Sequence, residues 1–220
     1  MFTNVLLLTK NIDVTRNLCN FANKMNTPIA IERHPWPPFM PAEPRVIMLG
    51  TFPPKRERWS MDFFYPNKIN DMWRIMGVIF YADRDHFWNQ DARRFRLADI
   101  QAFLHERGIA LWDTAMAVRR LKDNASDKFL EIVEPIDLLS LLDAHPSIGA
   151  VVTAGEKATG VIAAMAGVDL PPIGQPVACR VGEHDFALWR MPSSSRAYPL
   201  SIDKKADAYR AMFRAVGILT

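Results

Sequence analysis

The stretch from Ile47 to Trp59 reads IMLGTFPPKRERW, and its character changes abruptly at Gly50. The residues before this glycine are typical of a buried strand, whereas the two prolines after it exclude both a helix and a central strand. A cluster of basic residues then ends in Trp59. A buried strand that runs into a basic, aromatic loop predicts a binding place for an anionic or flat ligand.

Short apolar runs recur along the chain, with helical periodicity between them. The runs that we expect to be strands lie at residues 45–50, 108–113, 149–155 and 185–191. Nearly continuous apolar strands that alternate with helices predict an α/β fold, whose mainly parallel sheet is covered on both faces. Ligands of such sheets bind outside the carboxyl ends of the strands. The expected functional loops are therefore those at residues 50–59, 113–122, 155 and 191–200.

Composition describes an ordinary globular protein of 220 residues, 49% hydrophobic and 23% charged, with one main domain. The net charge of +3 is too small to indicate nucleic-acid binding by itself. Two distant cysteines and five histidines without ligand spacing predict no metal site, and we expect no cofactor. No apolar run suits a signal peptide or a membrane span, so we expect a cytoplasmic protein.

The first 44 residues read as a lead-in to the main domain. Residues 14–25 place apolar side chains at helical spacing and predict an amphipathic helix. The stretch HPWPPFMPAEP at residues 34–44 holds five prolines and predicts an extended connector. We therefore expect a helical appendage and Pro-rich connector over residues 1–44 and one α/β domain over residues 45–220.

The loop after the first strand carries cations beside aromatic rings. Its cations are Lys55, Arg56 and Arg58, and its rings are Phe52 and Trp59. Binding to a nucleic-acid strand requires cations that contact phosphates and rings that stack on bases. A solvated surface loop with one anchoring phenylalanine is the alternative interpretation.

The loop after the last strand, MPSSSRAYPLS at residues 191–201, offers hydroxyl and backbone donors beside a cation. Its candidate residues are Ser193, Ser194, Ser195, Arg196 and Tyr198. Such groups bind phosphate well, which predicts contact with a phosphate backbone. The alternative is a plain Ser/Pro turn before the final helix, with Ser201 as the helix cap.

Two further polar residues stand at the ends of predicted elements. Asp113 closes the second strand, from which its side chain can project into the cleft or cap the next turn. Asn70 directly precedes a helical pattern, in the position of an N-cap. A basic edge is expected to continue through Arg119, Arg120 and Lys122.

These segments, in this order, resemble the uracil-DNA glycosylase superfamily and in particular its hypoxanthine-DNA glycosylase branch. LGTFPP (49–54) is similar to the branch's first motif, a Gly-Ser-Phe-Pro-Ser-type loop. FFYPNKINDMWRIMG (63–77) is similar to its Tyr-Tyr-Ala-His-Pro-Arg-Asn-Arg-Phe-Trp segment. This likeness places Asn70 on the family's Asn and Trp73 on its Trp.

The resemblance extends to the later strands. GIALWDTAMAVRR (108–120) is similar to the second-strand segment, and MPSSSRAY (191–198) to the Leu-Pro-Ser-Thr-Ser-Pro-Ala-Asn-type loop that grips DNA. Arg196 and Tyr198 replace a Pro and an Asn of that loop. No acidic residue follows Gly50 closely, so the first motif lacks the water-activating Asp of the best-known branch. Residues 67–69 replace a His-Pro-Arg.

The resemblance implies a three-layer α/β/α sandwich around a short, mainly parallel, four-stranded sheet. It implies a monofunctional DNA glycosylase that flips a deaminated base out of DNA and hydrolyses its N-glycosidic bond, which starts base excision repair. Uracil, hypoxanthine and xanthine all stay open as the base. DNA is the expected partner, and the protein is expected to be a monomer associated with the nucleoid.

Roles for individual residues follow from the same resemblance. Asn70 would be catalytic. The expected base pocket comprises Gly50, Thr51, Phe52, Tyr65 and Asp113, and the expected DNA-binding residues are Lys55, Arg58, Ser193, Ser194, Ser195, Arg196 and Tyr198. Two alternatives remain open, a catalytically silent DNA-binding protein of the same fold and an enzyme that acts on free nucleosides or nucleotides.

Overall fold

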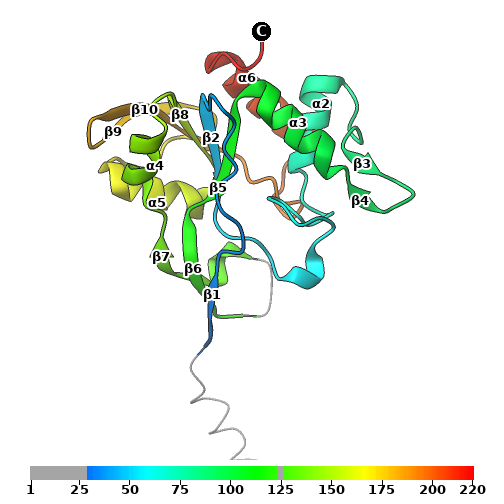
Figure 1. The fold of residues 1–220 in the computed structure, drawn as a ribbon, viewed down its shortest axis with the longest axis horizontal. Helices are drawn as coiled ribbons and strands as arrows, with labels where there is room; N and C mark the ends of the chain where they lie inside the picture. Colours follow the sequence, from blue (N-terminus) through cyan, green and yellow to red (C-terminus); the bar gives the residue numbers. More distant parts are fainter. Residues whose placement is uncertain (1–28, 123–125) are drawn as a thin grey trace, which may run out of the picture.

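The computed structural model describes residues 29–122 and 126–220. The helix predicted within residues 14–25 lies outside these ranges. The described chain has a mixed α/β fold, as predicted, with a central sheet, helices on either side of it and a smaller antiparallel sheet below (Figure 1).

The central sheet has five strands, and the prediction of four is wrong. In spatial order they are β5 (Ile109–Asp113), β2 (Val46–Gly50), β8 (Ala150–Ala154), β10 (His184–Met191) and β9 (Pro176–Val181). The first four are mutually parallel and match the four apolar runs, whereas β9 pairs antiparallel with β10 at the edge. The edge strand alternates between buried and exposed residues, so it lacks the continuous apolar run by which the others were recognised.

Helices cover both faces of this sheet because its strands are apolar on both sides. On one face, Val46 and Met48 of β2 pack in a cluster with α2 (Met72–Tyr81), α3 (Leu97–Arg107) and α6 (Ile202–Ala215). On the other, Ile47 and Leu49 pack with α4 (Leu138–Ala144) and α5 (Glu156–Ala166). All five residues of β2 are buried, and β2 lies inside the sheet, between β5 and β8.

A second, three-stranded antiparallel sheet has the order β1 (Ile31–Arg33), β6 (Ala115–Arg120) and β7 (Leu130–Pro135). Sequence analysis treated residues 113–122 as a loop, but β6 follows β5 after a single residue. The β6–β7 connection includes a short 3-10 helix, Asp127–Phe129, and another, Arg56–Arg58, follows β2. A hairpin of β3 (Trp88–Asn89) and β4 (Arg94–Phe95) precedes α3.

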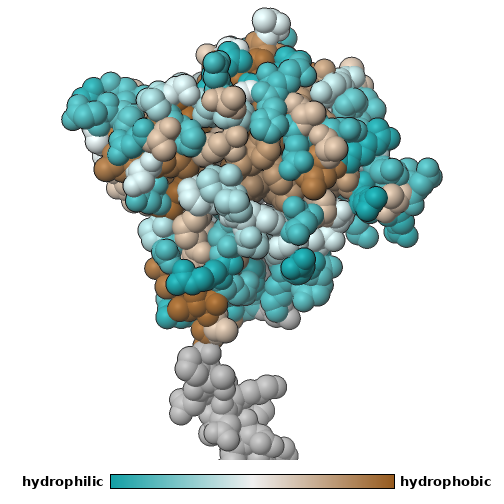
Figure 2. All heavy atoms as spheres, viewed as in Figure 1, coloured by the Kyte–Doolittle hydropathy of each residue, from teal (hydrophilic) through white to brown (hydrophobic). Residues whose placement is uncertain are grey.

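Apolar surface gathers at the lower end of the molecule, where β1 lies (Figure 2). Ile29 and Ile31 are 45% and 47% exposed there. The β1 backbone nevertheless is tied to the protein, because His34 donates its N–H to Met116 and Phe39 pairs with Leu111 of β5. Part of the Pro-rich segment is therefore integrated with the α/β core.

The two helix starts at which the sequence predicts a capping side chain both have one. Ser201 is the N-cap of α6 and accepts a hydrogen bond from the Lys204 N–H at 3.4 Å. At α2 the cap position falls on Asp71, one residue later than predicted. The Asn70 Oδ1 still accepts the Met72 N–H at 2.9 Å, so Asn70 caps the helix from one position further out.

The packing of α2 against the sheet predicts a large cost for Trp73→Ala. Trp73 is 1% exposed, and its Nε1 donates to the Phe64 carbonyl at 3.1 Å. We expect the truncation to lower the free energy of unfolding by about 3–5 kcal/mol, measured by urea denaturation. Leu170→Ala, at a side chain 45% exposed, is the control and should change stability by less than about 0.5 kcal/mol. Equal losses in the two variants would contradict this account of the core.

Candidate active site

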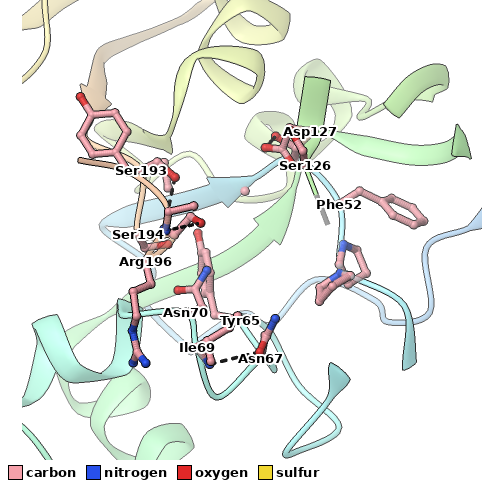
Figure 3. A pocket seen from close by; sticks show the side chains of 18 of the residues that line it. Phe52, Tyr65, Asn67, Ile69, Asn70, Ser126, Asp127, Ser193, Ser194 and Arg196 are labelled. Carbon is pink, nitrogen blue, oxygen red and sulfur yellow. Dashed lines mark hydrogen bonds between the residues drawn. The ribbon is translucent and has the colours of Figure 1, made fainter. Parts of the chain in front are cut away.

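A cavity of about 660 Å³ opens at the carboxyl ends of the four parallel strands, a volume within the usual range for ligand pockets. Four segments line it: the loop after β2, the segment that leads into α2, the β6–β7 connection and the serine loop, residues 191–200, after β10. Figure 3 shows these segments converging from different sides. The cavity lies where ligands of parallel sheets are expected, outside the carboxyl ends of the strands.

The floor of the cavity is formed where Gly50 meets Asp113. Their strands pair these two residues in register, and a Cβ on Gly50 would lie 2.4 Å from the Asp113 Oδ1. Only glycine can occupy this position without displacing the carboxylate. The Tyr65 hydroxyl lies 3.6 Å from the same hypothetical Cβ, so a phenol and a carboxylate flank the end of β2.

His34, which is not among the predicted site residues, forms a hydrogen bond with the Asp113 carboxyl. Its Nε2 lies 2.9 Å from the Asp113 Oδ2, and its Nδ1 lies 2.7 Å from the Trp36 carbonyl. The Trp36 N–H is also 3.2 Å from Nδ1, so the tautomer of His34 decides whether Nδ1 donates to the Trp36 carbonyl or accepts from the Trp36 N–H.

Burial raises the pKa of the Asp113 carboxyl, and the hydrogen bond from His34 opposes this shift. The carboxyl is 7% exposed and faces the cavity. A carboxyl with a raised pKa, a defined partner and access to a cleft is typical of a functional site.

Tyr65 occupies a strained position at the side of the cavity. Its φ is 51°, in the left-handed region that a residue with a large side chain rarely adopts. The hydroxyl is buried without a hydrogen-bond partner in the described chain, and burial raises its pKa well above the ordinary value. A neutral, unsatisfied hydroxyl beside a cavity can donate to a ligand or accept from one.

Asn70 lies between Tyr65 and the serine loop (Figure 3). Because its Oδ1 already accepts the Met72 N–H, its amide Nδ2 is the group left to act on a ligand. An amide N–H is a donor, so it can stabilise negative charge or hold the oxygen of a water. It cannot remove a proton.

Asp71, which follows Asn70 in the chain, is held to the serine loop through contacts of its buried carboxylate and its backbone N–H. Arg196 approaches its Oδ1 at 3.2 Å and Lys205 its Oδ2 at 3.2 Å, and Lys205 is fully buried. The Lys205 Nζ also donates to the Ser195 carbonyl at 2.8 Å, and the Asp71 N–H donates to Ser194 at 2.8 Å. These contacts fix the serine loop against the start of α2.

The structure places nearly all predicted DNA-binding residues at the cavity. Its lining includes Arg58, Ser193, Ser194, Ser195, Arg196 and Tyr198. Lys55, at the start of the 3-10 helix after β2, is exposed but does not line the cavity. The Ser193 and Ser195 hydroxyls accept backbone N–H groups within the loop at 3.2 and 3.3 Å.

Phe52 lies on the far side of the cavity from the serine loop (Figure 3). Its ring packs on a small cluster formed by Ala115, Val118 and Leu130 and meets His34 edge-on, with 5.6 Å between ring centroids. The ring is therefore fixed against the antiparallel sheet. Its stacking on a base stays a prediction.

The β6–β7 connection supplies residues that sequence analysis missed. Asp127 and Lys128 line the cavity, and the Asp127 Oδ2 accepts a hydrogen bond from Thr51 Oγ1 at 2.8 Å. The polar stretch at 122–128 between two β-like runs was the available signal for a hairpin.

The expected basic edge on β6 is only partly present. Arg120 is 8% exposed and forms an ion pair with Glu32 at 2.9 Å, so it is not a surface cation. Arg119 pairs with Glu131 at 2.9 Å. These arginines join the strands of the small sheet, because neighbouring strands carry opposite charges.

The described residues, 29–122 and 126–220, also bear on metal binding and on membrane insertion. No three His, Cys, Asp or Glu side chains within these ranges are grouped to hold a metal ion. Their helices are also too short or too polar to cross a membrane.

Comparison with known proteins finds no family model and no curated protein that matches the chain. Among solved structures, the fold is similar to that of a protein from Methanosarcina acetivorans, determined by solution NMR and named "putative Uracil DNA glycosylase". The two share 19% identity with a TM-score of 0.57, over 86% of this chain and 99% of the other. The likeness shows a mixed α/β fold of the uracil-DNA glycosylase type, and does not distinguish the hypoxanthine branch.

The contacts of Asp71 predict that Asp71→Asn destabilises the protein. The substitution leaves Lys205 buried without its counter-charge, which should lower the free energy of unfolding by about 3–5 kcal/mol. The double variant Asp71→Asn/Lys205→Met removes both charges and should recover most of this loss in urea denaturation. Losses that simply add in the double variant would show that the pair is not coupled.

The raised pKa of Asp113 predicts a pH-dependent difference between the wild type and Asp113→Asn. The folded state holds the carboxyl proton more tightly than the unfolded state, so this group lowers stability as pH rises above about 4. The stability of the wild type relative to Asp113→Asn should therefore fall from acidic to neutral pH. Urea denaturation across this range measures the difference, and a rise would contradict the burial of this charge.

Proposed function

We propose that the protein is a monofunctional DNA glycosylase, which flips a deaminated base out of DNA and hydrolyses its N-glycosidic bond. The observation that carries the proposal is the convergence of Asn70, Tyr65 and Asp113 with the serine loop around one cavity at the strand ends. The fold likeness to the protein named "putative Uracil DNA glycosylase" supports it.

Base recognition would use the floor of the cavity. Gly50 leaves the end of β2 open to close approach, and the backbone amides near Thr51 can donate to the edge of a base. Asp113 can accept a hydrogen bond from a ring N–H, and the buried Tyr65 hydroxyl can pair with a polar base atom. Uracil, hypoxanthine and xanthine differ by one or two such groups, so all three are candidate substrates.

Catalysis would depend on positioning and electrostatic stabilisation at Asn70. Cleavage of the glycosidic bond develops positive charge on the sugar and negative charge on the leaving base. The Asn70 Nδ2, fixed because Oδ1 is bound to the start of α2, can donate to the anionic base. The reaction consumes only water, and we expect it to need no cofactor.

DNA would be held by Arg58 and the serine loop. Arg196 keeps 48% of its side chain exposed although it contacts Asp71, so its remaining guanidinium donors can meet a phosphate. Contacts to flanking phosphates favour DNA over a free nucleoside, which has no phosphates to bind. Extruding a base costs a few kcal/mol, which contacts from this loop would offset.

The test is base release from duplex and single-stranded DNA that carries one uracil, hypoxanthine or xanthine, with abasic sites revealed by alkali. The wild type should release one or more of these bases. Asn70→Ala should lose about 10²-fold or more in single-turnover rate. Asn70→Asp keeps an oxygen that accepts the Met72 N–H, so it should fold normally yet cleave more slowly.

Three results would contradict the proposal or part of it. Cleavage by Asn70→Asp at the wild-type rate would show that the amide has no chemical role. DNA binding without release of any lesion would instead indicate a silent DNA-binding protein. Hydrolysis of free nucleosides that DNA does not inhibit would point to the small-molecule enzyme.

A further inference from the structure

Two carboxylates line the cavity, and they differ in what they can do. Asp113 is held by His34 through Oδ2, and its Oδ1 lies beside Gly50, where the proposed recognition of the base uses it. Asp127 enters from the β6–β7 connection and engages Thr51 through Oδ2. It is thus an acid beside the loop after β2, supplied by a segment far away in the sequence.

The surroundings of Asp127 suit a proton acceptor. Burial raises the pKa of its carboxyl, the Asp113 charge raises it further, and the Thr51 hydrogen bond with the nearby cations Lys157 and Arg120 opposes the shift. Because Thr51 donates its hydroxyl proton, it favours the ionised carboxylate. A carboxylate with a raised pKa is a stronger base than an ordinary one.

Asp127 and Asn70 occupy opposite walls of the cavity. In Figure 3, Asp127 lies on the side of Phe52, whereas Asn70 lies beside Tyr65 and the serine loop. The nucleophile and the leaving base are on opposite sides of the sugar C1′ when the glycosidic bond is displaced. An amide donor on one wall and a carboxylate on the other therefore suit the leaving base and the attacking water, respectively.

We infer that Asp127 is a catalytic carboxylate that accepts the proton of the attacking water, an inference that rests on the proposed glycosylase function. The water oxygen forms a bond to C1′ while the C1′–N bond breaks. The electron pair of the C1′–N bond leaves with the base. Asp127 takes one water proton, and the base is protonated from solvent. The carboxylate then returns its proton to solvent, so atoms and charge balance.

A purely structural role makes a different prediction. If Asp127 served only to hold Thr51, then Thr51→Val would impair cleavage as much as Asp127→Asn, because each removes or weakens the same contact. If Asp127 is the base, Asp127→Asn should be far worse, since its amide can still accept from Thr51 but cannot take a proton.

The experiment measures single-turnover base release, on the lesion that the wild type cleaves, for the wild type, Asp127→Asn and Thr51→Val. Asp169→Asn, at an exposed aspartate after α5, is the matched control. We expect Asp127→Asn to lose about 10²-fold or more, with no loss of affinity for an uncleavable lesion duplex and no drop in the urea midpoint. Thr51→Val should lose less, and Asp169→Asn nothing.

The pH dependence separates a base from an acid. The wild-type rate should rise with pH as Asp127 ionises, and this rising limb should be absent from Asp127→Asn. A wild-type rate that falls over the same interval, or equal losses in Asp127→Asn and Thr51→Val, would overturn the inference while the glycosylase function stands. Wild-type protein that releases no base from any lesion would overturn both.

Discussion

The arrangement of the cavity depends on a buried negative charge at the start of α2. Asp71 holds Arg196 and Lys205 at once, and Lys205 reaches on to the serine loop. The start of α2, the serine loop and the first turn of α6 thereby acquire fixed relative positions. A buried carboxylate is costly unless its partners are well placed, so the same contacts that satisfy Asp71 also set the distance between Asn70 and the serine loop.

The two sheets contribute different chemistry to the cavity. The parallel sheet ends in Gly50, which allows a flat ligand to come close, and in the Asp113 carboxyl beside it. The antiparallel sheet and its connections bring further ionisable groups, with His34 just after β1 and Asp127 between β6 and β7. The loop after β2 therefore lies beside two carboxyls although it has none close to Gly50.

Much of this architecture was predictable because apolar runs and capping residues are local features of the sequence. Apolar runs located the four parallel strands, and the carboxyl ends of these strands then indicated the place of the cavity. Ser201 was recognisable as a cap from its position alone. The edge strand β9 was missed because every second residue of it is exposed, so it lacks a continuous apolar run, and β6 was missed because it follows β5 after one residue and ends in two arginines. His34 and Asp127 were missed because their roles arise from pairing with Asp113 and Thr51, many residues away, and no spacing rule encodes such contacts.

The position of β1 also has a consequence for the order in which the protein can be assembled during synthesis. β1 emerges from the ribosome early, yet its partner strand is not complete until Arg120 has been made. Until then Ile29 and Ile31 belong to a strand without a neighbour, which is a site for wrong pairing. Once β6 arrives, His34 can reach Asp113 before β8 and β10 exist. The floor of the cavity can therefore form while half of the parallel sheet is still untranslated.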